Sequence, residues 1–170
     1  MEERIVMDSY KQSLGKYTVE QLRKIPADGV WSLAQMYDHV IVVAHEYLDE
    51  AEACAAVDPV QSRGKTEFGE KLFRDGGFPP VKIRLPDEMN QPPDNSGTPA
   101  SLLERLAELE KRMEGVGKKL HKVHSNLKRE HGGFGWLNAK EWHQLAEMHF
   151  RHHLRQKGEL EERLGIEKYE

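Results

Sequence analysis

The chain has 170 residues, of which 38% are hydrophobic and 32% charged, and its formal net charge is −4. This length suits one domain with a real core, and this composition is typical of a soluble helical protein rather than a sheet-rich or membrane protein. The mildly acidic balance argues against nucleic acid as the main partner, because proteins that bind a duplex usually present a basic face.

No segment of the sequence predicts membrane insertion or export. The longest aliphatic run, residues 40–44, is far too short to cross a bilayer. The first eight residues lack the apolar core of a signal peptide, so we expect the cytoplasm as the compartment. The single cysteine, Cys54, has no intrachain partner and lies among alanines, where we expect a small packed thiol.

The first predicted helix is amphipathic. Its apolar side chains recur at three- and four-residue steps, at Met7, Tyr10, Leu14 and Tyr17. Thr18 with Gln21 predicts a short second helical turn, and the Pro-Ala-Asp-Gly sequence of residues 26–29 is a turn signal that ends this segment.

The second predicted long helix starts at a capping box. Ser32 and Gln35 have the required spacing, and Trp31 and Met36 are placed to form the accompanying hydrophobic staple. Its expected inward face is Met36, His39 or Val40, Val43 and Tyr47. The helix should stop before Asp58, because a following proline disfavours helical backbone.

Residues 59–98 predict a long connection, because glycines and prolines interrupt any regular period. Loops of this length tend to be lids, binding loops or disordered segments. Apolar side chains suggest that much of it packs down, namely Phe68, Leu72, Phe73, Phe78, Val81, Ile83 and Leu85. We expect a short helix near residues 67–73, and a connection this long allows the flanking helices to run parallel.

The third long helix gives the clearest pattern. Thr98 and Pro99 form a cap and first-turn pair. An a/d seam follows, consisting of Leu102, Leu106, Leu109, Met113, Val116, Leu120, Val123 and Leu127. The seam fits either a dimeric coiled coil or an intramolecular bundle, and a single-domain chain with other amphipathic helices favours the bundle. The glycine-rich residues 131–135 end this helix.

A fourth long helix is predicted from Asn138 and Glu141, which form a second capping-box pair with Leu137 and Trp142 as the staple. It should run to about residues 164–165. The sequence therefore predicts an all-α fold, a four-helix bundle with a long crossover between its second and third helices. We expect residues 1–170 to form a single domain, with the long connection at about residues 59–98.

Three histidines lie on the predicted inward faces. His149 and His153 are one helical turn apart on the apolar stripe of the last helix, and His39 has a similar place on the second. A single histidine in such a stripe is more often a hydrogen-bonded core residue, but this arrangement could let three neutral imidazoles converge on one metal ion. His152 could substitute for His153. We favour His153, because Gln156 follows it on the same face.

The sequence gives less reason to assign a functional role to the other histidines. Four of them fall off the apolar stripes and are expected to be solvated, namely His45, His121, His124 and His143. His131 precedes a glycine loop, and the sequence does not decide between roles for it. Arg151 and Arg155 could bind a substrate carboxylate, but arginines on the polar side of a helix are usually just solvated.

Residues 31–39, Trp-Ser-Leu-Ala-Gln-Met-Tyr-Asp-His, and the distant His149-x-x-x-His153-x-x-Gln156 resemble the two signature regions of the DinB-like (YfiT-like) metal-binding superfamily. The resemblance implies a four-helix bundle with a long crossover, in which His39, His149 and His153 bind a divalent metal such as zinc or nickel, or manganese. Better-known relatives are transferases and isomerases that use a low-molecular-weight thiol such as bacillithiol, mycothiol or glutathione. Some members were proposed as metal-dependent hydrolases.

The catalytic hypothesis is that three histidines leave open coordination positions, where the ion would lower the pKa of a bound thiol or water. Glu46 lies seven residues after His39 on roughly the same face and is a weak candidate for a general base. The competing interpretation of Glu46 is a rim carboxylate exposed to water.

Two non-enzymatic alternatives stay open at the level of the sequence. The chain could be a metal- or ligand-binding bundle without turnover, or an interaction protein whose histidines are core polar groups and whose leucine seam recruits a partner. We expect a small-molecule substrate and neither nucleic acid nor membrane as a partner. Homodimer formation is an expectation from the resemblance alone.

Overall fold

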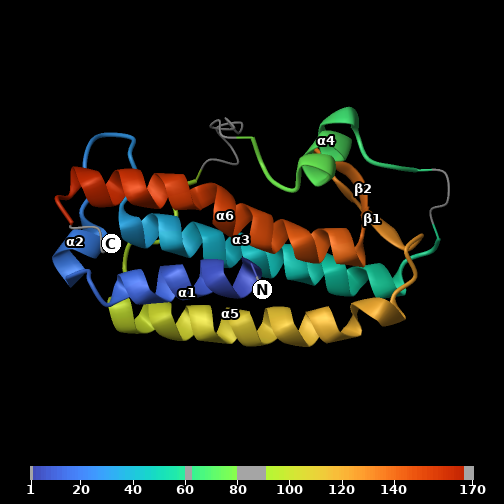
Figure 1. The fold of residues 1–170 in the computed structure, drawn as a ribbon, viewed down its shortest axis with the longest axis horizontal. Coiled ribbons are helices and arrows are strands. Elements are labelled where there is room, and N and C mark those ends of the chain that lie inside the picture. The colour runs from blue at the N-terminus through green and yellow to red at the C-terminus, as the bar shows by residue number, and fades with distance from the viewer. Residues whose placement is uncertain (1, 60–62, 80–90, 167–170) are drawn as a thin grey trace.

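The computed structural model describes residues 2–59, 63–79 and 91–166. Within these residues, four long helices form a bundle: α1 (Glu2–Leu14), α3 (Leu33–Ala53), α5 (Pro99–Lys119) and α6 (Ala139–Arg163). They lie side by side along one axis, and α3 and α5 run in the same direction, opposite to α1 and α6 (Figure 1). The long connection before α5 makes this order feasible, because it returns the chain along the bundle. The predicted all-α fold is confirmed.

Smaller elements complete the described part of the chain. The short helix α2 (Val19–Arg23) follows α1, and α4 (Glu67–Asp75) lies in the crossover. Both were predicted. A hairpin of β1 (Lys128–His131) and β2 (Gly135–Asn138) precedes α6, and Lys65 adds an isolated bridge to Gly135.

The helix starts follow from side-chain caps. Ser32, Thr98 and Asn138 each accept a hydrogen bond from the backbone three residues on, and each heads a reciprocal capping box. Such pairs satisfy backbone donors that a helix start would leave without partners. Thr18 does the same for α2. The predicted starts of the second, third and fourth long helices are therefore confirmed.

The buried face of α3 differs in part from the predicted inward face. Val40 lies fully inside the core, whereas Val43 and Tyr47 are half-buried at the edge of this face. The buried stripe continues instead through Ile41, Ala44, Leu48 and Ala51. The physical reason is that α3 packs against both α5 and α6, so its buried face is wider than a single stripe.

The leucine seam is helical over a shorter length than predicted. Its first five members, Leu102 to Val116, are buried within this one chain, which supports the intramolecular bundle. The helix ends at Lys119, a 3₁₀ turn covers Leu120–Lys122, and Val123 and Leu127 lie beyond it. The predicted continuation of the helix to residues 131–135 is wrong, because the chain pairs as the β1–β2 hairpin there.

The described end of the crossover is fixed to the end of α2 and the start of α3. The Gln35 side-chain amide donates to the Pro93 carbonyl over 3.2 Å, and that of Asn95 donates to the Arg23 carbonyl over 3.0 Å. Earlier in the crossover Leu72 is buried, Phe73 and Phe78 pack against the core, and Phe68 is exposed. The predicted packing of Val81, Ile83 and Leu85 falls outside the described residues.

None of the helices in the described part of the chain has both the length and the apolar character needed to traverse a bilayer.

Candidate metal centre

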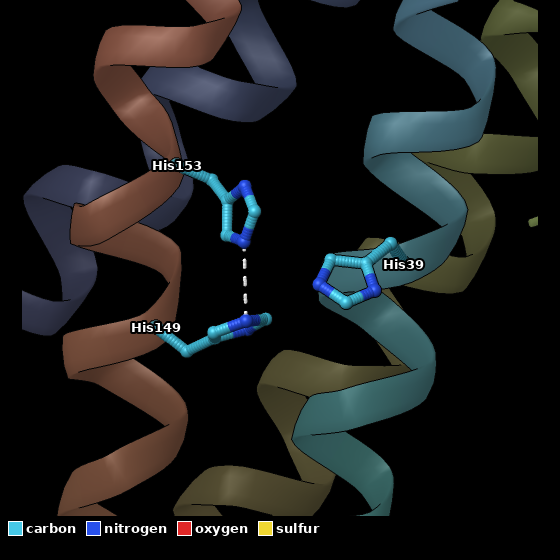
Figure 2. Close-up of side chains that lie close together, drawn as sticks. All are labelled: His39, His149 and His153. Carbon is cyan, nitrogen blue, oxygen red and sulfur yellow. Dashed lines mark hydrogen bonds between the residues drawn. The ribbon is translucent and has the colours of Figure 1, made fainter. Parts of the chain in front are cut away.

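Three histidines from two helices converge between α3 and α6. His149 and His153 project from successive turns of α6, and His39 points toward them from α3 (Figure 2). The centroids of the three rings lie 4.5 to 4.9 Å apart. Each ring offers one nitrogen within 4.8 Å of the other two. No other group of three or more potential ligand side chains lies this close among the residues that the structure describes.

Gln156 orients one of the three rings. Its side-chain oxygen lies 2.6 Å from Nδ1 of His153. Because an amide oxygen only accepts, Nδ1 of His153 carries the proton and Nε2 keeps its lone pair. Gln156 therefore turns the ligating nitrogen of His153 inward, as the partner of a metal-bound histidine commonly does.

His149 stands opposite that lone pair. Its Nε2 lies 3.1 Å from Nε2 of His153, so without a bound ion one of these nitrogens must donate to the other (Figure 2). The remaining nitrogen of His149, Nδ1, is buried and has no hydrogen-bond partner among the described residues. A buried imidazole with an unsatisfied nitrogen costs stability, which makes a purely structural role for His149 less favourable.

Burial keeps these imidazoles neutral. Desolvation lowers the pKa of His39 to about 4, and that of His153 also to about 4, although the hydrogen bond that His153 donates to Gln156 opposes the shift. Burial, reinforced by the neighbouring histidines, lowers the pKa of His149 well below its usual value. At neutral pH all three rings therefore have lone pairs available, which is the state that a metal ion requires.

The donor set fits a divalent metal of borderline softness. Two imidazole nitrogens on a tetrahedral zinc ion are about 3.3 Å apart, close to the 3.1 Å between Nε2 of His149 and Nε2 of His153. Zinc, nickel and related ions accept neutral imidazole, whereas calcium and magnesium prefer oxygen. Within the described residues no fourth protein ligand joins the cluster, as in catalytic zinc sites that keep one position open.

Aromatic side chains enclose the histidines. Trp31 lies 5.0 Å from the His39 ring, measured between ring centroids, and Tyr47 and Phe78 lie 6.0 and 5.9 Å from the His149 ring. Phe78 belongs to the crossover, so this segment contributes to the wall of the site. Apolar walls displace water and strengthen electrostatic interactions inside the site.

The sequence alone did not identify these aromatic walls as part of the site. The sequence predicts Trp31 in a helix staple, Tyr47 on the core face and Phe78 in general packing of the crossover. Tyr47 follows His39 by about two turns of α3, whereas Trp31 precedes the helix and has no helical spacing to His39. Phe78 carries no comparable signal, because its position depends on how the crossover folds back.

His152 does not join the cluster. Its ring packs against Phe78, with 5.2 Å between the ring centroids. The neighbouring position, His153, supplies the nitrogen that lies near His39 and His149. The alternative in which His152 replaces His153 therefore has less geometric support.

Glu46 lies away from the grouped nitrogens. Its side chain is exposed and lines a cleft that also includes Tyr47 and Trp142 and to which none of the three histidines contributes. This position agrees with the interpretation of a rim carboxylate. Its role as a general base stays a prediction.

Two histidines expected at the surface are partly buried instead. Nδ1 of His45 lies 2.9 Å from the Arg112 guanidinium, and Nε2 of His143 lies 2.8 Å from the Met113 carbonyl oxygen. Both bridge to α5, because the sides of α3 and α6 that carry these rings face the third long helix. His121 and His124 are exposed, as predicted.

The two arginines near the site have protein partners. Arg151 contacts the Glu147 carboxylate over 2.8 Å and donates to the Gly76 carbonyl over 2.6 Å, so it links α6 to the crossover. Arg155 pairs with Glu159 along the helix surface. These contacts favour structural roles over the binding of a substrate carboxylate.

Comparison with known proteins identifies a family for most of the chain. A family model described as the DinB superfamily matches residues 6–156. The matched region includes all of α3 and α5, most of α1 and α6, and all three grouped histidines. No curated protein and no solved structure matched the chain.

Proposed function

The chain belongs to the DinB superfamily, and from this membership and the grouped imidazoles we propose that it binds one divalent metal ion through His39, His149 and His153. Zinc and nickel are the preferred ions, with manganese as a further candidate. The observation that carries the proposal is the convergence of three neutral imidazoles without a fourth protein ligand among the described residues.

The site suits a metal-dependent reaction. A bound ion would lower the pKa of a coordinated thiol or water, so that a nucleophile is present near neutral pH. The chain's own residues prepare the surroundings: Gln156 fixes the ring of His153, and Trp31 and Phe78 narrow the space around the histidines. These contacts restrict the orientations that a substrate can adopt beside the imidazoles.

We propose a thiol S-transferase as the reaction class, with a low-molecular-weight thiol of the bacillithiol type as cosubstrate. The second candidate is a metal-dependent hydrolase, which would use the same open positions for water. A metal- or ligand-binding bundle without turnover, or an interaction bundle, is the non-catalytic alternative. We also propose a cytoplasmic compartment and a small-molecule substrate. Homodimer formation is a further proposal, which light scattering would test.

Elemental analysis of the tag-free protein tests the metal site. About one equivalent of zinc, nickel or manganese is expected in the parent and none in a variant with His39→Ala, His149→Ala and His153→Ala. A matched variant, His121→Ala, alters an exposed histidine and should retain the metal. A parent that is metal-free and also refuses added metal would contradict the proposal.

Turnover separates an enzyme from a binder. A metal-loaded sample is mixed with a model thiol and an electrophile such as 1-chloro-2,4-dinitrobenzene, and conjugation is followed by absorbance. We expect activity in the parent and its loss in His149→Ala, with circular dichroism showing that the helices persist. Equal activity in both proteins would count against the mechanism, and hydrolysis of a model ester or amide would favour the second candidate.

A further inference from the structure

The β1–β2 hairpin lies at one end of the bundle (Figure 1). Residues of β1, α3 and α6 line a cleft beside it. The cleft has a volume of about 340 Å³, and three rings and three carboxylates line it: Tyr47, His131, Trp142, Glu46, Glu50 and Glu130. They come from α3, β1 and the start of α6. None of His39, His149 and His153 lines this cleft, although Tyr47 borders both the cleft and the proposed metal centre.

The three rings form one aromatic group. The ring centroids of Tyr47 and Trp142 are 5.9 Å apart, those of His131 and Trp142 are 5.4 Å apart, and those of Tyr47 and His131 are 6.4 Å apart. Their planes are inclined by 41 to 44° to one another. Rings grouped in this way can present several π faces to one ligand, and such faces attract cations.

His131 is held rigidly in this group. Its Nδ1 accepts hydrogen bonds from the backbone N–H groups of Gly133 and Phe134, at 3.0 and 3.2 Å, and its ring stacks on Phe134. Burial lowers the pKa of His131, although Glu50 opposes the shift. The ring is therefore neutral at neutral pH and does not repel a cation.

The carboxylates give the cleft a negative charge. Glu50 is paired with Arg129, so its charge is balanced. Glu46 and Glu130 are exposed, and neither forms an ion pair within the described residues. Two uncompensated carboxylates beside three ring faces favour a cationic ligand and disfavour an anionic one.

Trp142 forms the buried side of this aromatic group. Its side chain is 4% exposed and belongs to the hydrophobic core, whereas Tyr47 and His131 are only partly buried. Its Nε1–H is closed to solvent, so a ligand in the cleft does not bond to it. The indole is therefore a nearby reporter of binding in the cleft.

We propose that this cleft binds a small organic ammonium ion. The ammonium group lies against the rings that line the cleft, and its charge is balanced by Glu46 and Glu130. Tyr47 also borders His149, so the bound ion is a neighbour of the metal centre. The inference goes beyond the proposed metal function and does not depend on it.

Choline and its neutral carbon isostere, 3,3-dimethyl-1-butanol, form a matched pair of probes. They share shape and hydroxyl and differ in the charge of one atom. Each is titrated into the full chain while NMR follows the indole N–H signals, with Trp142 assigned from a Trp142→Phe variant. We expect choline to shift the Trp142 signal and to bind about tenfold more tightly than the alcohol.

Charge-neutral variants locate the binding site. The double variant Glu46→Gln and Glu130→Gln should weaken choline binding about tenfold and leave binding of the alcohol unchanged. A control with the same change in net charge, Glu104→Gln and Glu162→Gln, alters exposed side chains outside the cleft and should bind choline like the parent.

Three results would overturn the inference: no binding of choline, equal affinity for both probes, or unchanged choline binding in the Glu46 and Glu130 double variant. The His39→Ala variant separates this inference from the metal proposal. It should lose metal and still bind choline, because His39 does not line the cleft. A protein that binds metal but no choline would refute the cleft proposal alone.

Discussion

The side-chain amide of Gln156 influences the candidate metal centre although it is not one of the three grouped side chains. Its oxygen accepts a hydrogen bond from Nδ1–H of His153 and so decides which nitrogen of that ring faces the cluster. The sequence indicated this pairing, since Gln156 follows His153 by three residues on one helix face. Partners of this kind are part of metal affinity even though they never touch the ion.

Replacing Gln156 with alanine should weaken zinc binding about 10- to 100-fold, because the His153 ring loses its fixed tautomer and orientation. Competition with a chromogenic chelator measures the affinity. Gln144→Ala on the same helix removes an exposed amide and serves as the control. Equal zinc affinity in parent and Gln156→Ala would show that the ring is oriented by packing alone.

Cys54 illustrates a residue whose role the sequence anticipated. Its thiol is fully buried, and desolvation raises its pKa to about 11. A raised pKa means that the thiol stays protonated at neutral and mildly alkaline pH, and only the thiolate reacts rapidly. The expectation of a packed thiol is confirmed by its burial.

The native protein should therefore react far more slowly with 5,5′-dithiobis(2-nitrobenzoic acid) than the unfolded chain does. Between pH 7 and 9 the native rate should stay low, because this range lies below the raised pKa of Cys54. Guanidinium-unfolded protein provides the fully reactive control. A stoichiometric reaction of the folded protein at pH 8 within minutes would contradict this account.

At the scale of elements, the hairpin and the short helix α4 depend on each other. The Thr66 backbone N–H donates to the Phe134 carbonyl oxygen over 2.9 Å, and the Thr66 hydroxyl donates to the Gly133 carbonyl oxygen over 2.9 Å. A Cβ at Gly69 would lie 2.2 Å from the Phe134 carbonyl oxygen. Glycine is thus required here by close backbone approach, not by an unusual dihedral angle.

Gly69→Ala should lower the free energy of unfolding by about 1–3 kcal/mol, since backbone must move to relieve the clash. Gly115→Ala is the matched control: a Cβ there meets nothing within 4 Å inside α5. That change should raise stability by about 0.5–1 kcal/mol through helix propensity. Urea unfolding measures both, and equal effects of the two substitutions would disprove the close contact.

The elements that the sequence predicted best are those with local signals. Ser32, Thr98 and Asn138 fix helix starts because each cap and its partner lie within one turn. The end of α5 was missed, because apolar spacing continues through Leu127 although the backbone leaves the helix after Lys119. Backbone pairing of β1 with β2, and of Lys65 with Gly135, determines the structure of the segment before α6. The spacing of apolar residues along the chain gives no sign of these contacts.

At the scale of the whole molecule, the proposed ion would join α3 to α6, two helices that are a hundred residues apart in sequence. A ligand that binds only the folded state stabilises it by an amount that grows with its concentration. The contribution is about 2.7 kcal/mol at a free metal concentration 100-fold above the dissociation constant.

Saturating zinc should therefore raise the melting temperature of the chelator-treated protein by roughly 5–10 °C. Differential scanning calorimetry measures the shift, and removal of the metal should reverse it. His149→Ala should show no shift with zinc, while His121→Ala should behave like the parent. A parent without any zinc-dependent shift would contradict the assignment of these ligands.

The sequence by itself determined the helical class, the caps, the pairing of His149 with His153 and the family resemblance. The caps and the His149–His153 pair depend on neighbours within one or two helical turns, where spacing along the chain corresponds to proximity in space. The resemblance depends on two short motifs that can be read without knowing how they meet in space. The assignment of the whole chain to one domain stays a prediction.

Only the tertiary structure decided that His39 meets the α6 pair, that Trp31, Tyr47 and Phe78 surround them, and that the hairpin closes a separate acidic cleft. Each of these depends on how α3, α6 and the crossover pack. Packing is set by the shapes of many side chains together, so no local spacing in the sequence specifies it.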